Sequence, residues 1–203
     1  AADSARRARG AAWRSFFPAP ADVTPDYWSY CRWRAGHRLC STMLTNFATQ
    51  ALLQAVGVGA RRSLPAAAGI NWLLKDGLGR LGRLSAATRF GESFDSDLKR
   101  FRFATSLLFT ASVGLELATP RFPAKFLALA AAANVGKSVG LTTYISTQPS
   151  FGQSFALRGN LADITAKAQA QQMVVDTAGL ALCVAVLRRG AAAAARAGGG
   201  PPR

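Results

Sequence analysis

Three glycines within residues 68–84 have the spacing of a phosphate-binding loop. Gly77, Gly79 and Gly82 spell G-x-G-x-x-G, the pattern that lets a backbone approach the pyrophosphate of a dinucleotide. That motif needs a buried strand before it and further βα units after it. Here the surrounding leucines recur at helical spacing instead. We therefore interpret the stretch as a helix with a face of small residues, and we expect no nucleotide cofactor.

A second glycine pattern resembles the end of an ATP-binding P-loop. Gly136-Lys137-Ser138 has the right residue types, but the first glycine of the full motif would be residue 131, which is alanine. Gly136 and Gly140 instead form G-x-x-x-G, which is typical of helices that pack closely. We expect Gly79, Gly82, Gly136 and Gly140 to lie against other helices.

Opposite charges near these glycines could form a polar site. Lys75 and Asp76 adjoin, and neighbours in a helix point about 100° apart, so each needs a partner from another segment. Asp163 and Lys167 are four residues apart, a spacing that places them on one helix face. The sequence predicts a polar pocket, which would be the ligand site, formed by Lys75, Asp76, Arg158, Asn160, Asp163 and Lys167. The alternative is two separate, solvated helix ends.

Metal and catalytic chemistry find little support in the remaining reactive residues. Cys31, His37 and Cys40 could be metal ligands, but a structural zinc needs four ligands at tighter spacing. An odd set of three cysteines, completed by Cys183, gives no disulfide framework. The single histidine argues against most Ser-His or Cys-His triads. We expect no metal, no cofactor and no assigned catalytic residue.

The elements that must position these residues are helices. Of the 203 residues, 50% are hydrophobic and 17% are charged, below the roughly 25% charged residues of soluble domains. The sequence predicts an all-α bundle of about five or six helices, associated with a membrane. Uncharged residues 39–60 either cross a bilayer or form a buried core helix. The expected helices start at Thr24-Pro25-Asp26 and at 98, 123 and 161, with ends at Ala118, before Pro149 and at Gly190.

Three charges stand alone inside apolar runs. Glu116, Lys137 and Asp176 would be costly in hydrocarbon, where ionisable groups usually face a partner or a transport pathway. We therefore predict that they are intramembrane charges with functional partners. The alternative places them at helix ends near water.

The ends of the chain are predicted to differ from the helical domain at 16–189. Residues 1–15 form a disordered basic arm or the remnant of a transit peptide, and residues 190–203 a disordered Ala/Gly/Pro tail. The net charge of +15 suits an anionic partner, yet no nucleic-acid motif accompanies it. We expect a membrane partner and no nucleic acid.

Several long segments resemble the root UVB sensitive family, and specifically its plant-like branch. VTPDYWSYCRW, NWLLKDGLGRLGRL, ANVGKSVGL and SFALRGNLADITAKAQAQ occur in the family's order within about residues 16–187. The resemblance implies roles in UV-B response, early seedling development, vitamin B6 homeostasis and auxin transport, in a plastid or other organelle membrane. It implies no agreed reaction. Family members usually continue into a C-terminal region that this chain does not contain.

The leading hypothesis is a membrane-associated helical protein that binds or passes a small molecule, with a protein of the same family as a candidate partner. One alternative is a soluble adaptor or scaffold without a ligand. The other is an enzyme that uses Lys75 and Asp76 together with Asp163 and Lys167, in which a lysine beside carboxylates acts as a base or Schiff-base group.

Overall fold

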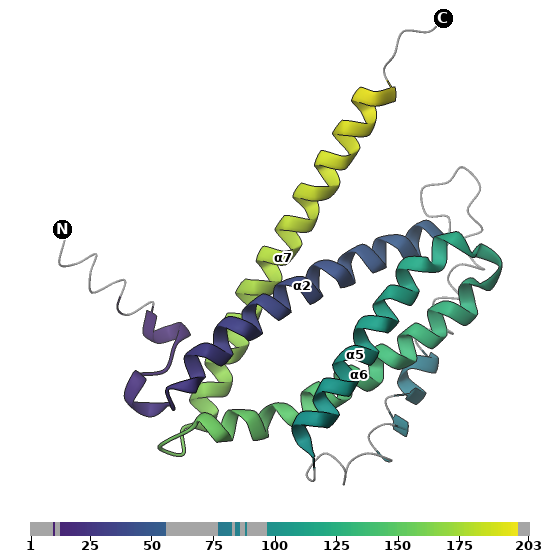
Figure 1. The fold of residues 1–203 in the computed structure, drawn as a ribbon. Coiled ribbons are helices and arrows are strands. Elements are labelled where there is room, and N and C mark those ends of the chain that lie inside the picture. The colour runs from purple at the N-terminus through teal and green to yellow at the C-terminus, as the bar shows by residue number, and fades with distance from the viewer. Residues whose placement is uncertain are drawn as a thin grey trace, which may run out of the picture. The chain divides into compact units, whose positions relative to one another are not determined.

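The computed structural model describes residues 10, 13–55, 77–82, 84, 85, 88 and 97–198, and it confirms the all-α class. Its long helices are α2 (Asp26–Ala55), α5 (Leu98–Ala118), α6 (Phe126–Phe155) and α7 (Leu161–Gly198), shown in Figure 1. Short 3-10 turns lie at Pro20–Asp22, Thr119–Arg121 and Pro123–Lys125. No β-strand occurs in these described ranges, where β pairing is limited to an isolated bridge between Val23 and Ala156.

The helix starts follow their sequence signals closely. Helix α2 begins at Asp26, directly after Thr24 and Pro25, and the amide of Tyr27 donates to the carbonyl of Thr24 at 3.0 Å. Helix α5 has the predicted bounds, 98–118. Asp97 occupies its N-cap position without a side-chain capping bond, and instead lies 3.6 Å from Arg100. The carboxylate of Asp97 therefore pairs within the first turn and does not cap a backbone amide.

Two predicted helix ends are wrong. Helix α6 does not stop before Pro149 but continues through it to Phe155. Proline has no N–H to donate to the carbonyl four residues earlier, so α6 lacks one helix hydrogen bond there. Beyond it, the Phe151 ring packs on the guanidinium of Arg102. Helix α7 likewise passes Gly190 and ends at Gly198, because the alanines that follow are the best helix formers. It therefore includes most of the 190–203 segment expected to be a disordered tail.

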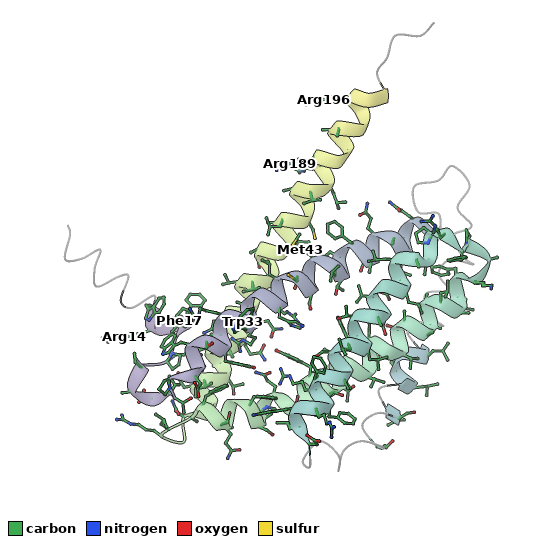
Figure 2. The ribbon with its side chains drawn as sticks, viewed as in Figure 1. Arg14, Phe17, Trp33, Met43, Arg189 and Arg196 are labelled. Atoms are coloured by element: carbon green, nitrogen blue, oxygen red, sulfur yellow. The ribbon has the colours of Figure 1, made fainter. Side chains whose placement is uncertain are left out.

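The chain forms two compact units. The first takes in Ala1–Asn46 and Phe155–Arg203, and the second Phe47–Ser154. In the first unit Val23, Tyr27, Cys31 and Ile164 form a buried cluster that joins the start of α2 to the start of α7. Aromatic rings extend this cluster, since Phe17 lies 5.7 Å from Trp28 between ring centroids, close to the N-terminal end of α2 (Figure 2).

Close packing at glycine organises the second unit. A Cβ on Gly136 of α6 would lie 2.2 Å from Ser112 Oγ of α5, and one on Gly140 would lie 2.9 Å from Phe109 Cβ. Gly79 and Gly82 face the same helix, α6, from another side, where added Cβ atoms would meet Asn134 and Val135. The predicted packing role of all four glycines is confirmed. A separate core cluster of Leu52, Phe126 and Ala130 packs the end of α2 against the start of α6.

We predict opposite effects for alanine at two helix glycines of the second unit. Gly140→Ala should lower the free energy of unfolding by roughly 1–3 kcal/mol, because the added methyl also meets the carbonyl oxygen of Thr105 at 3.0 Å. Gly114→Ala is the control, since its Cβ would have no described atom within 4 Å. It should raise stability by up to about 1 kcal/mol through helix propensity. Denaturant unfolding followed by circular dichroism checks both, and equal effects would refute the packing account.

Candidate functional site

In the second unit a fully buried carboxylate is paired across two helices. Glu116 of α5 has 0% exposure, and the side chain of Lys137 on α6 is 18% exposed. The ammonium nitrogen of Lys137 lies 2.6 Å from Glu116 Oε1 and donates a 2.7 Å hydrogen bond to Oε2. Both residues were predicted from sequence to need a partner, and each is the other's partner.

The local sequence explains how these two groups meet. Gly136 precedes Lys137, and the missing side chain lets α6 approach Ser112 of α5, four residues before Glu116. Thr119 Oγ1 donates to the Glu116 carbonyl at 2.7 Å and so satisfies a backbone acceptor at the end of α5. Moving either charge out of water costs free energy. The strong attraction between ammonium and carboxylate in a low dielectric offsets this cost only when both groups are present.

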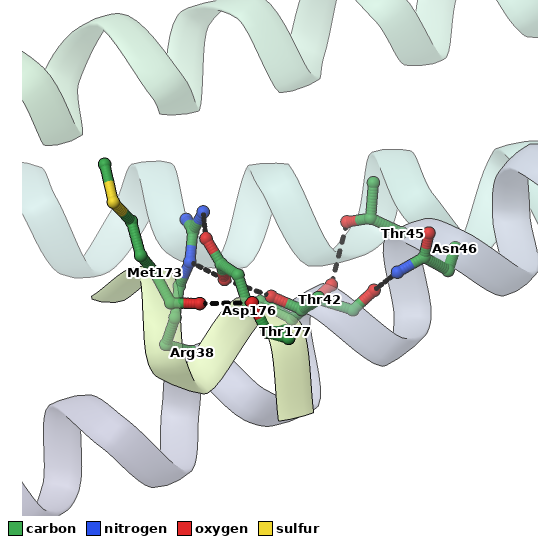
Figure 3. Close-up of polar contacts among 8 residues, drawn as sticks. Arg38, Thr42, Thr45, Asn46, Met173, Asp176 and Thr177 are labelled. Carbon is green, nitrogen blue, oxygen red and sulfur yellow. Dashed lines mark hydrogen bonds and ion pairs between the residues drawn. The ribbon is translucent and has the colours of Figure 1, made fainter. Parts of the chain in front are cut away.

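In the first unit α2 and α7 are joined by a second charge pair. Arg38 holds Asp176 through two hydrogen bonds, from Nε to Oδ1 at 2.6 Å and from Nη2 to Oδ2 at 2.7 Å (Figure 3). Thr42 Oγ1 donates to the same Oδ1 at 2.7 Å. Arg38 and Thr42 are four residues apart, so they lie on one face of α2. This bidentate geometry is the strong form of an arginine–carboxylate contact.

Gln171 forms a second polar link between these helices. Its Oε1 accepts a hydrogen bond from Arg34 and a weaker one, 3.8 Å long, from the Cys31 thiol. Its Nε2 donates to the Phe16 carbonyl at 2.7 Å and to the Tyr27 hydroxyl at 3.5 Å. Burial, together with the neighbouring Cys31, raises the pKa of Tyr27 to about 12, so the hydroxyl stays neutral at physiological pH.

The residues of the predicted polar pocket divide into smaller contacts. Lys75 and Asp76 lie outside the described residues. Asp163 and Lys167 pair with each other at 2.8 Å, as their spacing predicted. The segments 75–82 and 158–167 belong to different units, so a pocket between them stays a prediction.

Arg158 and Asn160 both contact Asp22. Arg158 Nη1 lies 3.2 Å from Asp22 Oδ1, and Asn160 Nδ2 donates to the Asp22 carbonyl at 3.2 Å. Asn160 directly precedes α7, but its Oδ1 is buried and accepts no hydrogen bond from the described part of the chain. Asn160 therefore does not cap α7 with its side chain. Asn160 instead uses its amide to fix the turn that carries Gly159, whose φ of 66° suits glycine.

The cysteines and acids form no metal centre in the described ranges, where no group of three or more His, Cys, Asp or Glu side chains has a suitable arrangement. The thiols of Cys31, Cys40 and Cys183 are free, and the first and last are buried.

Sequence reasoning did not identify the residues that bind Asp176. The i,i+4 spacing of Arg38 and Thr42 shows that they share one helix face, but nothing in the sequence shows that this face packs on Asp176 of α7. Arg102 was missed as well. Its guanidinium lies 4.6 Å and 4.5 Å from the ring centroids of Tyr144 and Phe151, and it binds α6 from α5.

Two of the described helices are long and apolar enough to cross a membrane by length and composition. They are residues 98–121, with mean hydropathy 1.2, and residues 161–193, with mean hydropathy 1.6. In the second helix, 11% of the most apolar 18-residue stretch is buried. The uncharged run 39–60 lies in α2 as far as Ala55 and is not among them.

Comparison with known proteins places the chain in a family. A family profile described as a vitamin B6 photo-protection and homoeostasis domain matches residues 2–196. The chain is 45% identical to root UVB sensitive 4 of Arabidopsis thaliana, over 88% of this chain and 34% of that protein. The chain belongs to the root UVB sensitive family. The resemblance drawn from its sequence segments is thus confirmed.

Other members of the root UVB sensitive family align over the same region. Identity is 41% with root UVB sensitive 6 of A. thaliana, over 84% of this chain and 34% of that protein. It is 36% with RUS family member 1 of Dictyostelium discoideum, over 82% and 32%. The chain thus spans about a third of the length of these relatives. No solved structure matches it.

We predict that the buried pair of this family member is strongly coupled. Glu116→Gln should destabilise the protein by roughly 3–5 kcal/mol, because the ammonium of Lys137 loses its counter-charge where little water reaches it. The double variant Glu116→Gln/Lys137→Met should cost clearly less than the sum of the single changes. Denaturant unfolding in a mild detergent measures each free energy.

The pair Asp163–Lys167 is the matched control, since Asp163 is 48% exposed. Asp163→Asn should cost no more than about 0.5 kcal/mol. Additive effects at Glu116 and Lys137, or equal losses at both pairs, would contradict the coupling.

Proposed function

We propose that this chain is a membrane-associated helical protein whose helix α7 enters the bilayer. The observation that carries the proposal is the exposed apolar segment of α7. Large side chains that are at least 40% exposed follow one another along it, namely Met173, Val174, Leu180, Leu182, Val184, Val186 and Leu187. Exposing such a series to water forgoes the free energy of burying it, and lipid removes that cost.

The directions of these side chains favour insertion of α7 into the bilayer over contact of a single helix face with the membrane surface. Successive helix residues point 100° apart, so Val184, Val186 and Leu187 project to different sides of α7. A helix that is apolar all round is typical of a protein core or a membrane span. Residues 161–193, at 1.5 Å per residue, extend over about 50 Å, enough to cross a hydrocarbon layer of about 30 Å.

The polar contacts of α7 are compatible with this environment. Asp176 interrupts the apolar run, and its carboxylate is held by Arg38 and Thr42. An acid within a membrane helix normally faces the helix bundle and a partner rather than lipid. Glu116 and Lys137 meet the same requirement between α5 and α6.

At the level of the organism, we propose the roles that the family resemblance implies: UV-B response, early seedling development, and vitamin B6 and auxin homeostasis, by binding or passing a small molecule. The names of the relatives support the UV-B role, and the description of the matching profile supports the vitamin B6 role. Seedling development and auxin homeostasis rest on the family resemblance alone. We propose an organelle membrane, and a plastid in particular, since one relative is named root UVB sensitive 2, chloroplastic.

We predict that a charge on the exposed apolar segment weakens membrane association. Leu180→Lys should reduce the carbonate-resistant membrane fraction, because lysine near the centre of a membrane helix costs about 3 kcal/mol more than leucine, or roughly a hundred-fold in insertion. Leu157→Lys is the control, a similarly exposed leucine between α6 and α7.

Carbonate extraction of membranes from cells expressing each variant gives the measurement. We expect the wild type and Leu157→Lys to stay in the pellet and Leu180→Lys to shift to the supernatant. Release of the wild type by carbonate would overturn membrane insertion and favour the soluble adaptor.

A further inference from the structure

The C-terminal end of α7 carries a cationic surface next to the exposed apolar segment. Arg188 and Arg189 directly follow Leu187, and Arg196 lies further along the same helix (Figure 2). All three are exposed. No acidic residue occurs among the described residues after Asp176, so this end of the helix carries positive charge alone. We call these three arginines the basic end of α7.

Helix geometry places two of the three arginines of the basic end on one side of α7. Arg189 and Arg196 are seven residues apart and therefore lie within about 20° of one another around the axis. Arg188 is turned by 100° from Arg189. The residues between 189 and 196 are Gly190 and alanines, which do not hinder the approach of a broad surface.

We propose that the basic end binds the headgroups of anionic phospholipids and so holds the C-terminal end of α7 at the headgroup layer of one leaflet. This inference rests on the proposed function, because it assumes that the apolar segment before Arg188 enters the bilayer. Long basic side chains at the end of such a helix extend to the interface, where they can contact lipid phosphates. The charge of the surface complements that of the headgroups.

A membrane surface fits this arrangement better than a nucleic acid does. Nucleic-acid surfaces usually combine cations with aromatic or polar side chains that read or stack on bases. Between Arg188 and Gly198 the helix has alanine, glycine and arginine alone. The residues just before Arg188 are apolar and exposed, as at the junction of hydrocarbon and headgroup.

The test compares vesicles with and without negative charge. The full chain is synthesised in a cell-free system with vesicles of phosphatidylcholine, or of phosphatidylcholine with 30% phosphatidylglycerol, and the floated fraction is measured. We expect the wild type to favour the anionic vesicles. In Arg189→Gln/Arg196→Gln, the ratio of bound to free protein on these vesicles should fall by about thirty-fold, while binding to phosphatidylcholine alone stays unchanged.

The control variant Arg14→Gln/Arg32→Gln removes the same charge from the net +15 at exposed positions away from the basic end. It should keep the anionic preference, and an equal loss in both variants would overturn the assignment to α7. Equal wild-type binding to both vesicle types would also overturn it, while membrane association stands. No binding to either would refute the proposed function itself. Binding of a short RNA is measured for the same variants. If Arg189→Gln/Arg196→Gln lost affinity for the RNA but kept the preference for anionic vesicles, the arginines would be assigned to nucleic acid.

Discussion

The ion pair between Glu116 and Lys137 is the contact on which the second unit depends. A carboxylate with no exposure is tolerated only beside its counter-charge, and here that charge comes from the neighbouring helix. The pairing requires α5 and α6 to approach closely and in one register. Gly136 and Gly140 permit the approach, because their missing side chains leave room for Ser112 and Phe109. The glycines and the ion pair are therefore two parts of a single packing device.

The first unit also pairs a charge between two helices, with different residues. Asp176 accepts hydrogen bonds from Arg38 and Thr42, and Gln171 accepts them from Arg34 and Cys31. In each unit a charge within an apolar helix faces its partner on another helix, and large apolar side chains remain exposed. Most other charged side chains, among them Arg100, Arg121 and Arg189, are exposed to solvent. The proposed membrane association therefore rests on the exposed apolar side chains and not on where the charges lie.

The class of fold and several helix starts could be predicted from the sequence because they depend on local signals. The Thr24-Pro25-Asp26 start and the 98–118 helix are examples. Local signals failed where tertiary packing or chain composition outweighed them, as at Pro149 within α6 and Gly190 within α7. Glu116, Lys137 and Asp176 could be recognised as charges that need partners. Arg38, Thr42 and Gln171 could not be named as partners or links, because helix contacts between distant segments leave no trace in one sequence.

The central claim, that charges pair between helices while the apolar side of α7 meets lipid, is tested most directly by thiol accessibility. Val186→Cys and Leu157→Cys are introduced separately into a chain in which exposed Cys40 is replaced by Ala, and Cys31 and Cys183 remain buried. Open membrane fragments are treated with a water-soluble maleimide before and after detergent is added. We predict that Leu157→Cys is labelled at once and that Val186→Cys is labelled only after detergent. Equal labelling of the two without detergent would contradict the account.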